Sequence, residues 1–287
     1  MALSSMLIQQ LLIIPKSINL ITFLLIAFNL IKKYKKTPEE QKYVLNRLFI
    51  FGFLSWSLYM LFDILLYPLA SLSFMNQGIQ QMDLIAYYPE QYPSLVIANI
   101  LRDIGLAAAF ALAYSYFFSA LIVMKGELWV NEKVLKKPLL PLVFLILTIY
   151  LIANDTIGVE IINGDIIVEA VWNGAAGFSI LFSIIIYFIA SLLLAMVILK
   201  MDYCERDLKI QFTKISIGMI LMSIGAIYWF IFGYIRTIFQ IDLVIVFIWY
   251  VFGHFIWSIS PILIYQGLRK MWKRECKQQP PTTPSSE

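Results

Sequence analysis

The chain has 287 residues, of which 61% are hydrophobic and only 14% are charged. Soluble domains contain about 25% charged residues, so this composition excludes an ordinary soluble domain and indicates an integral membrane protein. The net charge of +4 is small, and its basic residues gather on one side of the predicted spans, so it does not indicate nucleic-acid binding.

Apolar runs long enough to cross a bilayer occur seven times along the chain. The predicted spans lie near residues 8–31, 48–70, 95–124, 138–154, 175–199, 215–236 and 243–267. The fourth is the shortest, and Pro138 and Pro141 lie at its start. The sequence therefore predicts an all-α integral membrane fold, a seven-transmembrane-helix bundle over residues 1–268. A short basic and then disordered cytoplasmic tail, 269–287, follows it.

The basic residues predict how the spans are oriented. All but Lys16, Arg102 and Arg236, that is 19 of the 22, lie beside the loops after spans one, three and five or in the tail. The opposite loops contain acidic residues and no basic ones: Asp83, Glu90, Asp155, Glu160, Asp165, Glu169 and Asp242. Lysine and arginine accumulate on the cytoplasmic side, so we expect a cell-membrane protein with its N-terminus outside and its C-terminus in the cytoplasm. There the basic residues would meet anionic lipid head groups, and Cys204 and Cys276 would remain free thiols.

A short segment between the fourth and fifth spans predicts a small outer β-hairpin. Residues 159–169 read VEIINGDIIVE, and Asn163-Gly164 suits a type I′ turn. Pairing Ile162 with Asp165 places four apolar side chains on one face: Val159, Ile161, Ile166 and Val168. Such a hairpin is a candidate lid across the outer mouth of the bundle.

Small residues recur within the spans at spacings that favour close helix packing. Gly105, Ala109 and Ala113 follow one another at four-residue intervals, and Ser-Ile-Gly occurs twice in the sixth span, at 216–218 and 223–225. Small side chains let membrane helices approach closely, so both patterns predict packing seams.

Three ionisable residues are predicted to lie deep within the spans: Lys16, Asp63 and His254. The number of uncharged residues between each of them and the nearest charge at the cytoplasmic boundary gives its depth. Each lies about 22 Å from that boundary, within the outer third of a hydrocarbon core about 30 Å thick. Charge is unfavourable there, so the equal depth of Lys16 and Asp63 predicts either a structural ion pair or a ligand contact. His254 is predicted to be a packed, hydrogen-bonded core histidine, with proton sensing as the alternative.

Three further charged residues form a shallower layer at the outer edge of the core. Arg102, Asp103 and Arg236 lie about 32 Å above the cytoplasmic boundary by the same count. Neighbouring helix residues point about 100° apart, so Arg102 and Asp103 cannot face one partner together. Either this pair lies in head-group water, or one of the two turns inward, with Asp103 matched in depth to Arg236. The cytoplasmic half of the core lacks charge, which disfavours an ion channel.

The chain lacks the residues that several classes of enzyme and cofactor site require. One histidine and two cysteines do not form the usual metal sites. The H-E-x-x-H, G-x-S-x-G and phosphate-binding glycine motifs are missing. Asp63 and Asp103 differ by about six residues in depth, roughly 9 Å, whereas an intramembrane aspartyl protease needs facing aspartates. We expect no enzymatic activity, no metal and no cofactor.

In span number and orientation the chain resembles the heptahelical receptors and the microbial rhodopsins. The resemblance covers topology alone. Residues 243–267 contain no lysine that could hold retinal, and the third span ends in LIVMKGELW rather than in an acidic-Arg-aromatic motif. The last span contains SPILIY in place of N-P-x-x-Y. We therefore assign no family.

The leading functional interpretation is a receptor- or sensor-like multi-pass protein with an outward-opening polar pocket. Its candidate ligand-binding residues are Lys16, Asp63, Arg102, Asp103, Arg236 and His254. The five charged ones sum to +1, which favours a small anionic or zwitterionic ligand. Pro261 is a candidate hinge in the last span. The tail is too short for an output domain, so a separate cytoplasmic or membrane protein partner would carry the signal. The alternatives are a transporter or lipid-handling carrier, and a structural membrane subunit.

Overall fold

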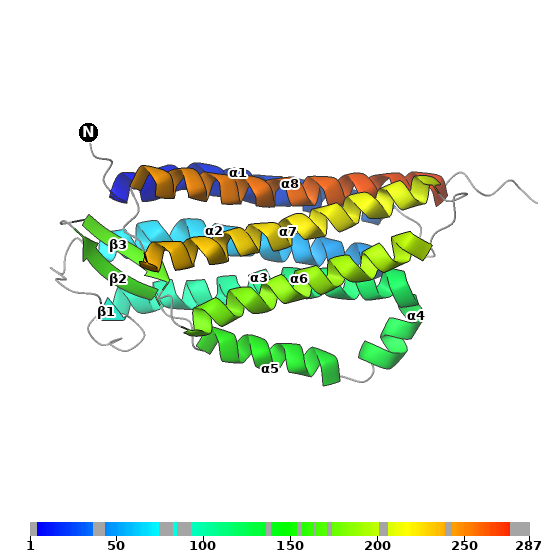
Figure 1. Cartoon of the computed structure of the whole chain (residues 1–287), viewed down its shortest axis with the longest axis horizontal. Helices are drawn as coiled ribbons and strands as arrows, with labels where there is room; N and C mark the ends of the chain where they lie inside the picture. The colour runs from blue at the N-terminus through cyan, green and yellow to red at the C-terminus, as the bar shows by residue number, and fades with distance from the viewer. Residues whose placement is uncertain are drawn as a thin grey trace, which may run out of the picture.

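The computed structural model of the protein describes residues 5–36, 44–74, 83–84, 93–135, 139–153, 157–162, 165–170, 174–200, 206–238 and 243–275. Six long helices dominate it (Figure 1): α1 (Ser5–Lys36), α2 (Val44–Phe74), α3 (Pro93–Lys125), α6 (Gly174–Lys200), α7 (Arg206–Ile238) and α8 (Leu243–Glu275). The shorter elements are α4 (Glu127–Val130), a π-helical turn η3 (Asn131–Leu135), α5 (Leu139–Ala153), and the strands β1 (Asp83–Leu84), β2 (Ile157–Ile162) and β3 (Asp165–Ala170).

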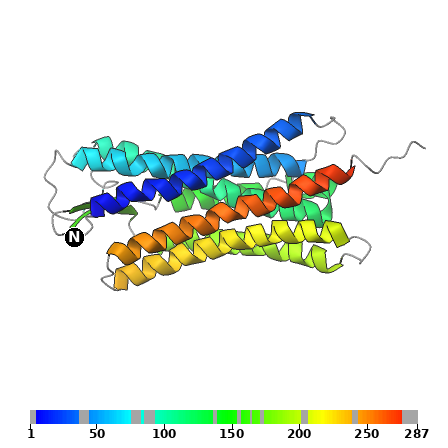
Figure 2. The same cartoon turned by 90° about the horizontal axis from the view of Figure 1, so that it is seen from above.

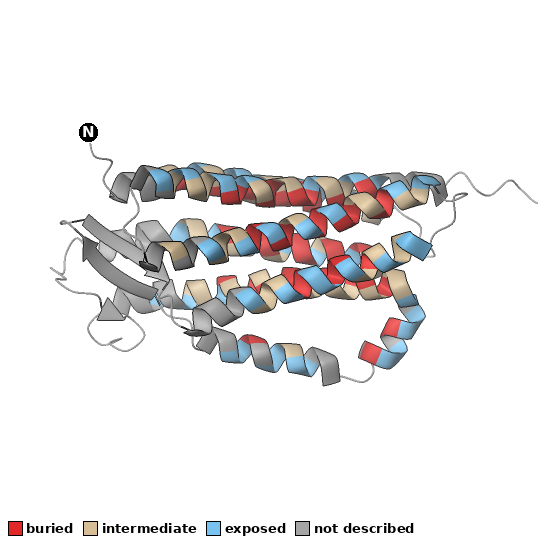
Figure 3. Cartoon of the chain, viewed as in Figure 1, coloured by how far each residue is buried: buried red, intermediate tan, exposed pale blue. Residues whose placement is uncertain are grey.

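The six long helices form a closed ring. In the order α1, α2, α3, α6, α7, α8 each helix packs on the next, and α8 packs back on α1. Figure 2 shows α8 lying between α1 and α7. Buried residues face the inside of the ring (Figure 3), while large apolar side chains such as Phe28, Phe188 and Phe255 are more than half exposed on its outside. An apolar exterior around a packed interior is what a bilayer requires of a helical protein.

By length and hydropathy, these six helices are the candidate membrane spans among the described residues. The chain is therefore a multi-pass membrane protein. The predicted fourth span, 138–154, corresponds to α5, which is not one of the six. Its 15 residues extend about 22 Å, less than the ~30 Å of a hydrocarbon core. It lies outside the ring against α3 and α6.

The direction of α5 follows from the helices on either side of it. Both α3 and α6 run away from the strands, so the chain between them returns toward the strands along α5 (Figure 1). We call the end of the ring that carries the strands and the start of α1 the sheet end. We call the opposite end the basic end, because the exposed Arg47, Lys125, Lys200, Arg206 and Arg269 lie there.

A three-stranded antiparallel sheet in the order β1-β2-β3 lies at the sheet end. β2 and β3 pair Ile162 with Asp165, and β1, from the connection between α2 and α3, pairs Asp83 with Val159. The strand β1 was not predicted. β3 lies against α1 and α2. Residues 163–164 and the side chains of the strands lie outside what the structure describes, so the apolar face and the lid remain predictions.

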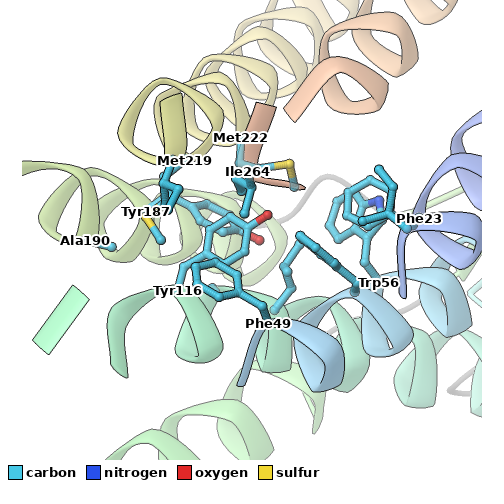
Figure 4. Packing of buried hydrophobic residues seen from close by; sticks show 14 of the residues in the cluster. Phe23, Phe49, Trp56, Tyr116, Tyr187, Ala190, Met219, Met222 and Ile264 are labelled. Carbon is cyan, nitrogen blue, oxygen red and sulfur yellow. The ribbon is translucent and has the colours of Figure 1, made fainter. Parts of the chain in front are cut away.

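An aromatic and aliphatic core fills the ring from the side toward the basic end as far as Trp56, Met60 and Trp257. Phe23, Phe49, Phe53, Tyr116 and Tyr187 belong to it, and Figure 4 shows their helices meeting around Met219, Met222 and Ile264. The rings interlock: Phe53 and Tyr116 lie edge to face with centroids 6.4 Å apart, and Tyr116 and Tyr187 with centroids 5.7 Å apart. α1, α2, α3 and α6 are thereby joined by one continuous packed cluster.

The two Ser-Ile-Gly sequences form a packing seam between α7 and α8, which confirms the prediction. A Cβ atom on Gly225 would lie 2.3 Å from Nε1 of Trp257, and one on Gly218 would lie 2.6 Å from Cγ1 of Ile264. The seam is reciprocal, since a Cβ atom on Gly253 of α8 would lie 2.8 Å from Nε1 of Trp229 on α7. Each glycine therefore receives a large side chain from the facing helix.

Candidate functional site

Lys16 and Asp63 form an ion pair inside the ring, as their equal predicted depth indicated. Nζ of Lys16 on α1 lies 2.6 Å from Oδ2 of Asp63 on α2, and the two side chains are only 6% and 13% exposed. Removing charge from water is unfavourable, and a short contact to an opposite charge offsets much of that loss. The pair lies in the half of the ring toward the sheet end, because Lys16 occurs early in α1 and Asp63 late in α2.

Asn19 links the helix of Lys16 to two neighbouring helices. It lies three residues after Lys16, on the same face of α1, and is fully buried. Its Oδ1 accepts a hydrogen bond from Nε1 of Trp56 on α2 (2.8 Å). Its Nδ2 donates to the carbonyl oxygen of His254 (3.3 Å) and to Oγ of Ser258 (3.2 Å), both on α8. One amide therefore holds α1, α2 and α8 in a fixed arrangement.

His254 is buried in this same region, with 2% of its surface exposed. Its ring packs edge to face against Trp229 and Trp257, with centroids 5.5 and 5.8 Å away, and it lies within electrostatic range of Lys16 and Asp63. Within the described part of the chain, neither ring nitrogen has a hydrogen-bond partner. The predicted packing is confirmed, but the predicted hydrogen bonding is not found among these residues.

Four aromatic side chains surround the buried polar groups. Trp56 and Trp257 lie edge to face with centroids 5.1 Å apart, and Trp257 stacks on Trp229 at 5.6 Å. Tyr250 contacts Trp229 at 4.5 Å. Together with the ion pair, Asn19, Ser258 and His254, these rings define what we call the polar cluster, which is built from α1, α2, α7 and α8.

The structure brings one residue of the shallower layer toward the polar cluster. Arg102 is half-buried on α3 and lies within electrostatic range of Lys16. Asp103 is also half-buried, with its Oδ1 atom buried. The two alternatives for this pair, head-group water or an inward turn, both remain predictions. Arg236 belongs to α7, but its side chain is outside the described part of the structure. A contact between Arg236 and Asp103, suggested by their equal depth, therefore remains a prediction.

Pro261 lies in the middle of α8, which continues as one helix past it. It is buried, and the neighbouring Ser260 donates a hydrogen bond from Oγ to the carbonyl oxygen of Gly218 on α7 (2.7 Å). This bond ties α8 to α7 beside the proline. The hinge remains a prediction, because no second position of α8 is observed.

Sequence reasoning missed the residues that make the hydrogen bonds of the polar cluster, namely Asn19, Trp56 and Ser258. A search restricted to ionisable side chains passes over an asparagine. Nevertheless, an amide within an apolar span, three residues from a lysine, is a usable signal, since polar groups at that depth need partners. Trp56 and Ser258 give no comparable signal, because tryptophan and serine are common in membrane helices.

No metal site emerges from these groups. The described residues contain no cluster of three or more histidine, cysteine, aspartate or glutamate side chains that could hold an ion.

No protein-family model matches the chain, and a search of curated proteins finds no match either. The geometry of the polar cluster is therefore the basis for a functional proposal.

Proposed function

We propose that this protein is a receptor- or sensor-like membrane protein that binds a small ligand at the polar cluster. The observation that supports this most directly is the buried Lys16–Asp63 ion pair, which lies toward the sheet end while the aromatic core fills the ring below it. In the described part of the chain, Lys16 is the one buried residue among the lysines, arginines, aspartates and glutamates. Buried charge at one end of a bundle favours binding from that end over passage through it.

We further propose that the sheet end faces outward and that the chain crosses the membrane seven times. The exposed basic residues at the opposite end support a cytoplasmic position for that end. Seven crossings follow if α5 counts as one, and its return direction between the parallel helices α3 and α6 supports this. We also propose that the bilayer is the cell membrane and that the role of the protein is not enzymatic.

The signal would travel through the contacts of α8 with α1 and α7. Asn19 joins α1 to α8 in the polar cluster, and at the basic end Nζ of Lys33 donates to the carbonyl oxygen of Arg269 (3.4 Å). A ligand that separates α1 from α8 at the cluster would therefore disturb a second contact between the same helices at the basic end. This is a population shift between two packings, read by a separate partner protein.

Native mass spectrometry of gently extracted protein tests the proposal. We expect a bound small molecule in the wild type that is lost in Asp63→Asn or Arg102→Ala. The matched control is Lys133→Ala, which removes an exposed charge at the basic end. A bound molecule retained in all variants would contradict a site at the polar cluster.

Hydrogen–deuterium exchange separates a receptor from the alternatives. Adding the identified molecule to the apo protein should change exchange at residues 206–214 and 265–275, which lie at the basic end. Uptake of the molecule into proteoliposomes without that change would instead indicate a transporter or lipid-handling carrier. A clean apo mass, with unfolding on extraction, would indicate a structural subunit that needs another chain.

A further inference from the structure

The polar cluster has a charge arrangement that restricts which ligand it can accept. Lys16 and Asp63 are paired with each other at 2.6 Å in a nearly dry environment. Removing one partner from a buried ion pair leaves the other charge uncompensated, which is strongly destabilising. A ligand that binds by contacting either charge must therefore leave both charges neutralised.

A ligand with a single charge cannot neutralise both Lys16 and Asp63 when it binds between them. A carboxylate that draws Lys16 to itself leaves Asp63 without a cation, and an amine that binds Asp63 leaves Lys16 without an anion. A ligand carrying both charges satisfies both side chains at once. Its negative group replaces Asp63 at Lys16, while its positive group replaces Lys16 at Asp63, and no net charge enters the membrane interior.

We propose that the polar cluster binds a small zwitterion of the α-amino acid or betaine class, held between Lys16 and Asp63. This inference rests on the proposed receptor function and specifies its ligand. Arg102, within electrostatic range of Lys16, adds a second positive charge near the negative group of the ligand. The positive group would lie near aromatic rings, because Trp56 bonds to Asn19 and Trp257 packs against His254.

The aromatic rings suit the remaining parts of such a ligand. Ammonium groups bind favourably over the faces of tryptophan rings. Trp229, Trp257 and Trp56 also offer apolar contact to a hydrocarbon side chain of the ligand. These indoles belong to three different helices, so a bound side chain would contact α2, α7 and α8 together.

A second, independent observation points to a ligand at the same place. His254 is 2% exposed, yet neither of its ring nitrogens has a hydrogen-bond partner among the described residues. Buried polar groups in proteins are nearly always hydrogen-bonded. The neutral imidazole has one donor and one acceptor: the carboxylate of either ligand class can accept from the donor, and the ammonium group of an α-amino acid can donate to the acceptor.

The test uses the full-length protein in lipid nanodiscs and measures thermal shift and calorimetric binding. The probes are the twenty common L-amino acids and glycine betaine. For each hit, the two singly charged analogues are compared. For L-phenylalanine these are 3-phenylpropionate, which lacks the amine, and 2-phenylethylamine, which lacks the carboxylate. We expect at least one zwitterion to bind at least tenfold more tightly than either analogue.

Two variants locate the binding within the polar cluster. The double variant Lys16→Met with Asp63→Leu replaces the pair by apolar groups of similar size, so it should fold while losing at least tenfold in affinity. His254→Phe keeps a flat ring in the packed site and should lower affinity several-fold. Lys133→Met, which alters an exposed lysine at the basic end, should bind as the wild type does.

Each remaining outcome decides against the inference, and the outcomes separate it from the proposed function. If a singly charged analogue binds as tightly as the zwitterion, the charge argument is wrong while a ligand site remains. If no probe binds but native mass spectrometry finds another bound molecule, the ligand class is wrong and the receptor proposal stands. If no probe binds and every sample is apo, both are wrong. Unchanged zwitterion affinity in the folded double variant would place the site elsewhere.

Discussion

The two halves of the helix ring share aromatic packing, but only the half toward the sheet end has a buried ion pair among the described residues. Toward the sheet end, α1, α2 and α8 are joined by an ion pair and by the hydrogen bonds of one asparagine. Toward the basic end, interlocked aromatic and aliphatic side chains join the helices, and this packing continues to Trp56 and Trp257 beside the polar groups. In lipid, where apolar surface gains little by being buried, both kinds of contact are effective, but they differ in what they permit.

The difference lies in whether a contact can be exchanged for another. A hydrogen bond or ion pair can be transferred to a ligand that offers the same donors, acceptors and charges. A packed aromatic ring has no such substitute, because displacing it leaves a cavity. The polar half is therefore the half in which a ligand can change helix positions, and the aromatic half is suited to serve as the fixed base.

The largest expected effect comes from removing one member of the ion pair. Asp63→Ala leaves the lysine ammonium buried without its partner and should destabilise the protein by about 3–5 kcal/mol. The double variant Lys16→Met with Asp63→Leu should recover most of that loss. Thermal unfolding in nanodiscs measures both. If the single variant proves as stable as the double, the pair is not what holds the polar half.

A smaller loss is expected from the asparagine that bridges three helices. Asn19→Leu removes the acceptor of the Trp56 indole N–H and should cost about 1–3 kcal/mol, since a buried donor is left unsatisfied. The matched control is Asn29→Leu, because Asn29 is exposed on the same helix, nearer the basic end. Unfolding measurements that show equal losses for the two variants would refute the bridging role.

The prediction of the ion pair from sequence shows what residue depth can and cannot supply. Counting uncharged residues from a boundary charge gives a position along the membrane normal, and this sufficed to match Lys16 with Asp63. It gives no position around the ring. The order α1, α2, α3, α6, α7, α8, the place of α5 outside it, and the approach of Arg102 to Lys16 all depend on that second coordinate. The sequence of each helix indicates this position around the ring only weakly, because the residues that face lipid and those that face the core are both apolar.

The α7–α8 seam allows a tightly packed glycine, Gly225, to be compared with a less tightly packed one, Gly105 on α3. Gly225→Ala would place a methyl group 2.3 Å from the Trp257 indole, and overpacking of this kind costs about 1–3 kcal/mol. Gly105→Ala on α3 is the control, because its methyl group would lie 3.5 Å from Tyr59, an ordinary contact. Both variants introduce alanine into a transmembrane helix, so the difference between their unfolding temperatures measures the effect of the closer packing at Gly225. Equal temperatures would show that Trp257 moves aside freely and that the seam is not rigid.

The smallest expected effect concerns α5, which belongs to neither half of the ring. The Tyr114 ring on α3 stacks on Phe144 of α5 with centroids 4.5 Å apart, and its hydroxyl donates to the Phe144 carbonyl oxygen (3.1 Å) and contacts Thr148. Tyr114→Phe keeps the stacking and removes the hydroxyl, a loss of about 0.5–1.5 kcal/mol.

Where that loss appears decides how α5 relates to the ring. If α5 is an outer helix that the ring does not need, deuterium exchange should rise within residues 139–153 while the unfolding temperature of the whole protein stays nearly unchanged. If the unfolding temperature falls and exchange rises throughout α3 and α6 as well, α5 unfolds together with the ring. The seventh segment would then be as integral as the other six, and its short length would mean a locally thinned bilayer beside α3 rather than a loosely attached helix.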